Sequence, residues 1–231
     1  MAEQERLRAE RDFSRALGAV DEMLSEVGEW DLRDTPQMEP VRRRLLQKAL
    51  TFYQAMAGED PHNELLRRRV ANAQINVGEI QAQLGAYTDS LAALRAAERL
   101  WGSLAEESAD ADALRKHAIC LASIARVKMI SGISPDVVSD FRRAISELQR
   151  IPQQNSVGQL DALATALANY AVLLSETGEL EEAERITREA LRSLEEGPQG
   201  NPVVQQHQGS LTNNLAKFLM QQEKLDEAEE Q

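Results

Sequence analysis

Histidine and cysteine are the side chains from which catalytic or metal-binding chemistry is most readily built, and this sequence has few of them. The three histidines, His62, His117 and His207, are far apart, and none belongs to an HExxH motif or a Cys/His metal spacing. His117 and the single cysteine, Cys120, fall on one face of an expected helix, but such a pair offers only two ligands. The histidines are interpreted as ordinary helix residues and Cys120 as a small core residue.

The motifs of phosphate chemistry are also missing. The sequence has no P-loop, no dinucleotide fingerprint, and no kinase set of Gly-rich loop, HRD and DFG. Paired glutamates such as Glu181 and Glu182 are adjacent on an expected helix and therefore point in different directions, as solvated charges do. The chain is predicted to be non-catalytic, with no catalytic residues, no cofactor and no bound metal.

Composition predicts an all-α protein that does not enter a membrane. Aromatic residues make up 4% of the 231 residues, while Ala, Leu, Glu, Gln and Arg are abundant, which favours helix and leaves little material for strands. No apolar run approaches the roughly 20 residues of a membrane span. The first residues, MAEQERLRAE, lack the apolar core of a signal peptide.

The net charge of −12 argues against nucleic acid as the main partner, because phosphate binding requires a cationic surface. Acids outnumber bases by 11 to 5 in residues 1–40 and by 14 to 5 in residues 157–231. Residues 41–70 reverse this balance, with 7 bases and 3 acids. That basic segment is interpreted as a solvated face that pairs with neighbouring acids, and the alternative is a site for an acidic partner segment.

Residues 162–191 predict a helical hairpin. Apolar residues recur at three- and four-residue steps on both sides of Gly178, a residue type that ends helices in the left-handed conformation. The same turn position recurs at spacings of 47, 46 and 45 residues, at Gly85, Gly132, Gly178 and Glu223. A small residue recurs in the second helix at Ala49, Ala97, Ala144 and Ala190. One hairpin cannot bury both of its faces, so the pattern indicates a stack of hairpins.

The expected organisation follows from this spacing. Residues 1–60 form a first hairpin with a long first helix from about 3 to 28 and a second that begins at Pro36 or Pro40 and ends at Gly58. Repeats follow at about 61–105, 110–151, 158–196 and 202–231. In the last, a helix is expected from about 202 to 222 and its partner begins at Leu225. The incomplete final hairpin suggests a piece of a longer protein.

The repeats resemble the tetratricopeptide repeat. Its Leu-Gly pair is matched by Val77-Gly78, Ile124-Ala125, Tyr170-Ala171 and Leu215-Ala216. The repeats are longer than the usual 34 or so residues and look most like those of kinesin light chain, as in LTNNLAKFLMQQEKLDEAEE. The resemblance implies a right-handed superhelix of stacked antiparallel hairpins. It also implies that the first helix of each pair lines a concave groove, which binds a peptide or protein segment.

The family's groove positions can be carried over to the first helices of these repeats. They correspond to Asn76, Glu79, Ser123, Arg126, Met129, Asn169, Val172, Asn213, Asn214, Lys217 and Met220. Asn recurs at one of these positions, as Asn76, Asn169 and Asn214, and an amide offers a donor and an acceptor to a peptide backbone. The alternative is that these amides bond between adjacent helices, and this structural role is favoured for Asn76 and Asn213. The family's basic chaperone-binding clamp is disfavoured, since Ile119, Ser123 and Thr165 occupy its positions.

A second resemblance covers about the first 60 residues. The run AERDFSRALGAVDEMLSEVGEWDLRDTPQMEPVRRRLLQKALTFYQAM looks like the segment that opens the repeat region of planctomycete-type bacterial serine/threonine kinases. It implies a kinase and a membrane span upstream, with this chain as an extramembrane sensor or docking region. The alternative function is self-assembly into a homodimer through the helix from Leu7 to Val27 or through the incomplete C-terminal hairpin.

Overall fold

A computed structural model of the chain describes Gly18 and residues 39–108, 110–132, 136–151, 156–198 and 200–229. All regular structure in these residues is helical, with no strand. The helices, in chain order, are α2 (Glu39–Glu59), α3 (Glu64–Gln83), α4 (Tyr87–Ser108), α5 (Ala111–Ser131), α6 (Val137–Arg150), α7 (Val157–Glu176), α8 (Leu180–Glu195) and α9 (Pro202–Glu229). Helix α2 ends at Glu59, one residue after the expected Gly58.

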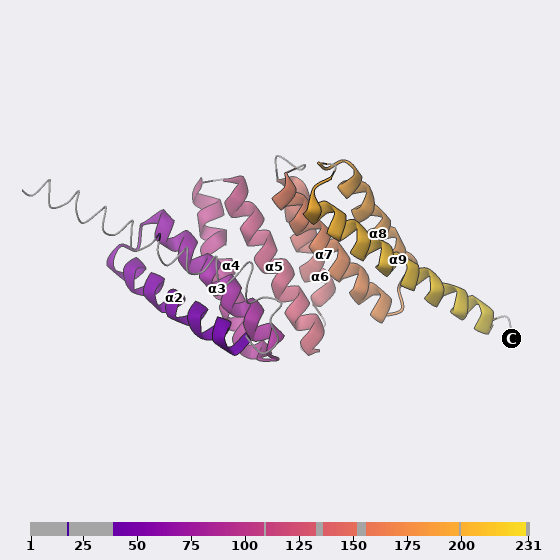
Figure 1. Cartoon of the computed structure of the whole chain (residues 1–231), viewed down its shortest axis with the longest axis horizontal. Helices are drawn as coiled ribbons and strands as arrows, with labels where there is room; N and C mark the ends of the chain where they lie inside the picture. Colours follow the sequence, from indigo (N-terminus) through magenta and orange to yellow (C-terminus); the bar gives the residue numbers. More distant parts are fainter. Residues whose placement is uncertain are drawn as a thin grey trace, which may run out of the picture. The chain divides into compact units, whose positions relative to one another are not determined.

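The helices pack with their neighbours in sequence. The described residues divide into two compact units, one up to Ala97 and one from Glu98 onward, so that α4 contributes to both. In the first unit α2 packs against α3, and in the second each helix from α5 to α9 packs against the next (Figure 1). The predicted all-α stack of helical hairpins is confirmed. The handedness of a superhelix through both units stays a prediction.

The first helices of the hairpins, α3, α5 and α7, begin or end at residues whose chemistry suits that position. Asn63 and Ser156 cap α3 and α7, because their side-chain oxygens accept hydrogen bonds from the backbone N–H groups of Leu66 and Gln159 at 3.2 and 3.3 Å. After these helices and α5, the chain turns at glycines with positive φ: Gly85 at 75°, Gly132 at 68° and Gly178 at 86°. Residues with a Cβ atom rarely adopt this conformation, which explains the recurrent glycine.

Small residues let the two helices of a hairpin approach closely. A Cβ atom added to Gly78 of α3 would lie 2.7 Å from Cγ of Leu94 in α4, which is too close for a real contact. The same approach allows the hydroxyl of Ser90 to donate a 2.7 Å hydrogen bond to the carbonyl oxygen of Gly78. In the α7–α8 hairpin, Ala171 and Ala183 are completely buried. The spacing between paired helices is therefore set by the smallest side chains in the repeat.

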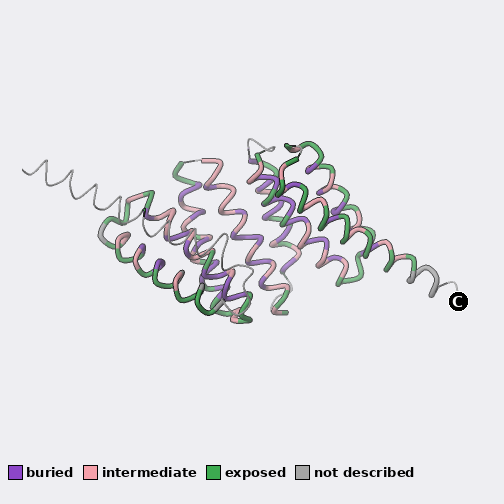
Figure 2. Tube along the Cα trace, in the orientation of Figure 1, coloured by how far each residue is buried: buried purple, intermediate pink, exposed green. Residues whose placement is uncertain are grey.

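The core of the second unit surrounds α7, which packs against α5, α6, α8 and α9. Leu167, Tyr170 and Leu174 are at most 2% exposed, and the ring of Tyr170 stacks on that of Phe141 with centroids 6.0 Å apart. Buried positions follow the sides of the helices that face their neighbours, and exposed positions follow the outer sides (Figure 2). Burial of these side chains contributes about 1.5–3 kcal/mol each, which makes α7 the centre of this unit.

The expectation that no segment is apolar enough to span a membrane was wrong for α7. This helix is long and apolar enough to cross a membrane, judged by length and composition only, and the described residues contain no other such helix. However, 56% of its apolar window is buried inside the protein. A helix that contacts four others must be apolar on most of its sides, which explains its composition.

The prediction that the last helix ends near residue 222 was also wrong. Helix α9 continues through Glu223 to Glu229. Glu223 occupies the position at which the other repeats have glycine, and a residue with a Cβ atom continues a helix more readily than it adopts positive φ. The expected helix from 3 to 28, with its assembly surface from Leu7 to Val27, lies outside the described residues apart from Gly18.

Replacement of Gly178 by Val is expected to destabilise the chain by about 1–2 kcal/mol, because an L-residue is strained in the left-handed conformation. A Cβ atom at this position would meet nothing within 4 Å, so the first atom of the new side chain adds no steric overlap to the strain of the backbone. Urea unfolding followed by circular dichroism measures the effect. Gly209→Ala in α9, also free of contacts, is the control and should stabilise slightly. An unchanged free energy of unfolding for Gly178→Val would contradict the role of this glycine.

Candidate functional site

The first helices of successive hairpins form a continuous row in the second unit. Helix α7 contacts both α5 and α9 directly, whereas the described residues of the second helices α6 and α8 do not approach each other as closely. Side chains connect α6 and α8 instead, and the amide of Gln149 donates to the carboxylate of Glu189 at 3.1 Å. The two sides of the stack therefore differ in how closely their helices are packed.

Two polar contacts show that α7 and α9 run in parallel and in register. His207 Nε2 lies 2.7 Å from Asp161 Oδ1 near the start of the two helices, and the hydroxyl of Ser175 donates to Gln221 Oε1 at 3.0 Å near their far ends. Both pairs join residues 46 positions apart, which matches the repeat length expected from the sequence. Equivalent positions of successive repeats are thus neighbours along the row of first helices.

The predicted groove residues all lie on first helices. Asn76 and Glu79 belong to α3 in the first unit, and the others belong to α5, α7 and α9 in the second. The exposed ones are Asn76, Asn213, Lys217 and Met220, and the half-buried ones are Glu79, Ser123, Arg126, Met129, Asn169, Val172 and Asn214.

The predicted groove residues differ in whether their side chains already interact with other groups of the chain. Met129 packs against the core of the second unit, and Glu79 and Arg126 already interact with other groups of the chain. The amides of Asn76, Asn169, Asn213 and Asn214 make no hydrogen bond to any described residue. The structure therefore shows no interhelical bond for these asparagines, including the two for which a structural role was favoured. Their donors and acceptors are available to another molecule.

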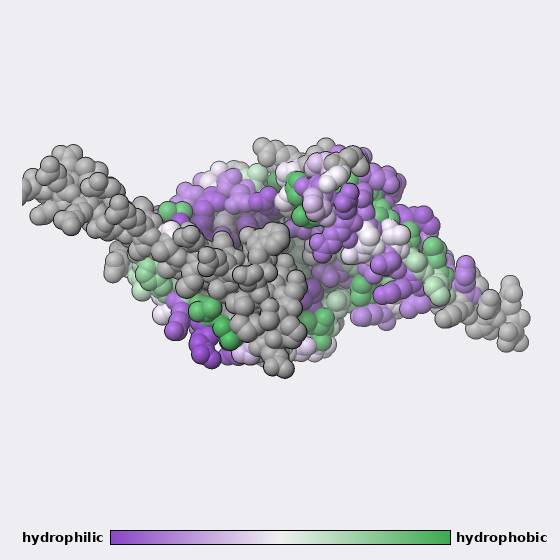
Figure 3. All heavy atoms as spheres, viewed as in Figure 1, coloured by the Kyte–Doolittle hydropathy of each residue, from purple (hydrophilic) through white to green (hydrophobic). Residues whose placement is uncertain are grey.

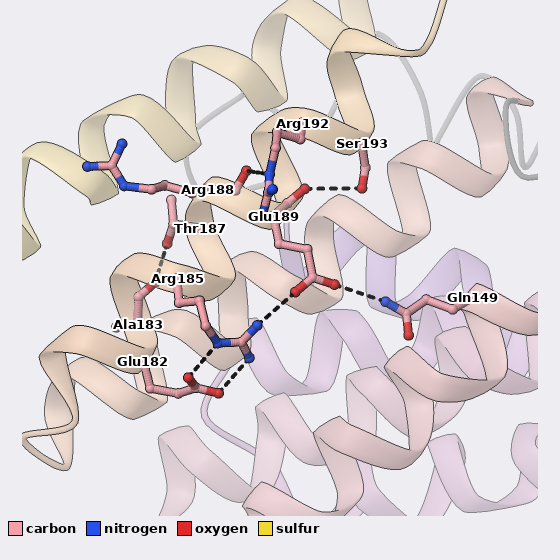
Figure 4. A network of polar contacts seen from close by, with 9 residues as sticks. All are labelled: Gln149, Glu182, Ala183, Arg185, Thr187, Arg188, Glu189, Arg192 and Ser193. Atoms are coloured by element: carbon pink, nitrogen blue, oxygen red, sulfur yellow. Dashed lines mark hydrogen bonds and ion pairs between the residues drawn. The ribbon is translucent and has the colours of Figure 1, made fainter.

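The second helices carry a polar network whose residues satisfy one another (Figure 4). Arg185 donates to both carboxylate oxygens of Glu182 at 2.6 and 2.7 Å and to Glu189 at 3.3 Å. The hydrogen bond from Arg185 lowers the pKa of Glu182, and Glu182 in turn raises the pKa of Arg185. Arg142 donates to the hydroxyl of Tyr170 at 2.9 Å, and this bond raises the pKa of Arg142.

The histidines and the cysteine occupy separate environments. His62 is exposed, Cys120 is completely buried, and His207 contacts Asp161 as described above. His117 lies between two carboxylates, with Nδ1 at 2.9 Å from Glu147 and Nε2 at 3.4 Å from Glu98. In the part of the chain that the structure describes, no group of three or more His, Cys, Asp or Glu side chains is arranged to hold a metal ion. The sequence did not predict the contacts of His117 with Glu98 and Glu147, because these partners are far from His117 along the chain.

The visible surface around the last helices is mixed in character. Hydrophobic and hydrophilic residues alternate along α8 and α9, and they do not merge into one large apolar patch on this face (Figure 3). Met220 of α9 is the most exposed large hydrophobic side chain among the described residues, at 57%. An exposed methionine is an adaptable apolar contact for a partner.

Comparison with known families identifies the central hairpin. A family model described as tetratricopeptide repeat matches residues 163–196, which comprise most of α7 and all of α8. Residues 163–196 are therefore similar to one tetratricopeptide repeat. The search of curated proteins found no match. Tetratricopeptide repeats are typical of non-catalytic protein-interaction scaffolds, and this is the functional class that the match supports.

Replacement of Glu182 by Gln should make stability less dependent on pH. The pKa of Glu182 in the folded protein is lower than its ordinary value of 4.5, so its contribution is complete above that value and is lost as the pH falls through the folded pKa. The variant should be less stable at pH 7 by about 0.2–1 kcal/mol, as for other exposed ion pairs.

Denaturant unfolding of the variant and of the unchanged chain over a range of pH measures this difference, which should shrink in acid. Glu181→Gln is the matched control, because Glu181 is the exposed neighbour of Glu182 in the same helical turn. An equal loss in both variants would show that the pairing with Arg185 is not the cause.

Proposed function

We propose that this chain is a scaffold that binds an extended peptide segment along its row of first helices. The observation that carries the proposal is the direct contact of α7 with α5 and α9, compared with the wider separation of α6 and α8. A stack curves toward the side on which its helices are closer, so the first helices of the second unit form its concave side. Repeat arrays of this kind use their concave surfaces for binding.

The recurrent asparagines supply the chemistry for such a ligand. Asn169 and Asn214 lie on α7 and α9, which run in parallel one repeat apart, and neither amide bonds to a described residue. Each amide can donate to a carbonyl and accept from an N–H group of a peptide backbone. Lys217 and Met220, both exposed on α9, add a charge and an apolar contact for side chains of the peptide. The resemblance to kinesin light chain supports the same use of a ladder of asparagines.

The scaffold is proposed to serve a larger signalling protein. The support is the resemblance of the segment from Ala9 to Met56 to the region that opens the repeats of planctomycete-type serine/threonine kinases. In that arrangement the repeats act as the docking or sensor region of a membrane-bound kinase. Genomic sequence upstream of Met1 tests this proposal. An in-frame kinase domain followed by an apolar span would support it, and an unrelated gene in that position would exclude it.

The double variant Asn169→Ala with Asn214→Ala should weaken peptide binding by about 1–3 kcal/mol, because polar groups of the bound peptide lose their partners. Peptides selected from a random dodecamer library on the full chain provide the ligand, and calorimetry gives the affinity. Circular dichroism establishes that the fold is intact.

The control is Gln149→Ala with Ser193→Ala, which removes polar groups from the second helices α6 and α8. This control should bind the selected peptide as the unchanged chain does. Equal affinity of the asparagine variant and the unchanged chain would place the peptide elsewhere.

A further inference from the structure

The second unit has a cavity whose lining contains none of the predicted groove residues. It has a volume of about 560 Å³, within the range typical of sites for small ligands. The end of α4, the start of α5 and the end of α6 line it, and all of its lining residues belong to the second unit.

The cavity and the groove are on opposite sides of α5. His117 lines the cavity, and Arg126 is one of the predicted groove residues. The two are nine residues apart, which corresponds to about two and a half helical turns, so their side chains leave the helix in opposite directions. A ligand in this cavity would therefore not compete directly with a peptide on the row of first helices.

One wall of the cavity is built from polar side chains that contact one another. His117 contacts Glu147 at 2.9 Å and Glu98 at 3.4 Å, and Arg143 donates to Glu147 at 3.1 Å. Gly102 faces this wall, since a Cβ atom there would lie 3.3 Å from the ring of His117. The absence of a side chain at Gly102 leaves the space beside the imidazole open.

The remaining lining combines two cations with an apolar floor. Arg99 and Arg150 are exposed, and neither guanidinium group makes an ion pair or hydrogen bond with a described residue. Ala105 and Ile151 are 8% and 4% exposed, and the half-buried Leu114 is a third apolar residue of the lining. Guanidinium groups match the planar geometry of a carboxylate and bind it through paired hydrogen bonds.

We propose that this cavity binds a small monoanionic carboxylate with an apolar body, its carboxylate held by Arg99 and Arg150 and its body on the floor of Leu114 and Ile151. A dianion such as a phosphate monoester fits less well, because Glu98, Glu106 and Glu147 also line the cavity and repel a second negative charge. The site is independent of the peptide groove, and neither proposal requires the other.

The test uses 1-naphthaleneacetate as the probe, with its neutral amide, 1-naphthaleneacetamide, as the matched compound. Titration into the full 231-residue chain, followed by calorimetry and by backbone amide resonances, should show saturable binding of the acid with shifts at residues of α4, α5 and α6. The amide should bind about tenfold more weakly, because it lacks the charge that the arginines recognise. Equal binding of the two compounds, or no saturable shift at millimolar concentration, would overturn the proposal.

Two variants locate the site. Arg99→Gln with Arg150→Gln should weaken binding of the acid about tenfold, whereas Arg188→Gln with Arg192→Gln, which makes the same change of charge on α8, should not change it. Gly102→Leu should abolish binding by filling the cavity beside His117 and, since Leu favours helix more than Gly, should not reduce helix content. Binding that survives both the arginine variant and Gly102→Leu would place the probe elsewhere and overturn the assignment.

Discussion

The close approach of two helices at small residues is the constraint on which the rest of this structure depends. At Gly78 the backbone of α3 lies against Leu94 and accepts a hydrogen bond from Ser90, which leaves no room for even one carbon atom more. Ala171 and Ala183 occupy the interior of the α7–α8 hairpin in the same way. Hairpins packed this closely present two apolar faces, so each must stack on the next, and the stack places first helices on one side and second helices on the other.

The two sides of this stack use their polar groups differently. On the second helices, Glu182, Arg185, Glu189 and Gln149 satisfy one another, and such networks position helices without leaving groups for a ligand. On the first helices, the amides of Asn169 and Asn214 are half-buried and make no bond within the described chain. Polar groups without a hydrogen bond inside the protein are the ones available to a ligand. This difference supports a peptide site on the first helices rather than on the second helices, whose polar groups bond to one another.

The polar residues of the cavity likewise divide into those that bond to one another and those that do not. His117, Glu98, Glu147 and Arg143 hold one another in place and shape its wall. The exposed guanidinium groups of Arg99 and Arg150 have no such partners among the described residues, which is why the proposal assigns the anion to them. Helix α5 thus has two different faces. One face carries the predicted groove residues, and the opposite face lines the cavity. If both proposals hold, this single helix contributes to sites for two chemically different ligands.

Local patterns in the sequence determined the helices, their turns and their stacking, since a left-handed turn requires glycine, a close approach requires a small residue, and both recur at the repeat spacing. Those patterns also placed the candidate groove residues on first helices. They did not determine which polar groups of these residues stay unpaired. Only the tertiary structure decided that α9 runs straight past Glu223, that α7 is apolar because four helices surround it, and that Glu98 and Glu147 meet at His117. These features depend on residues from different helices, and the distance between such residues is set by packing rather than by any spacing along the chain.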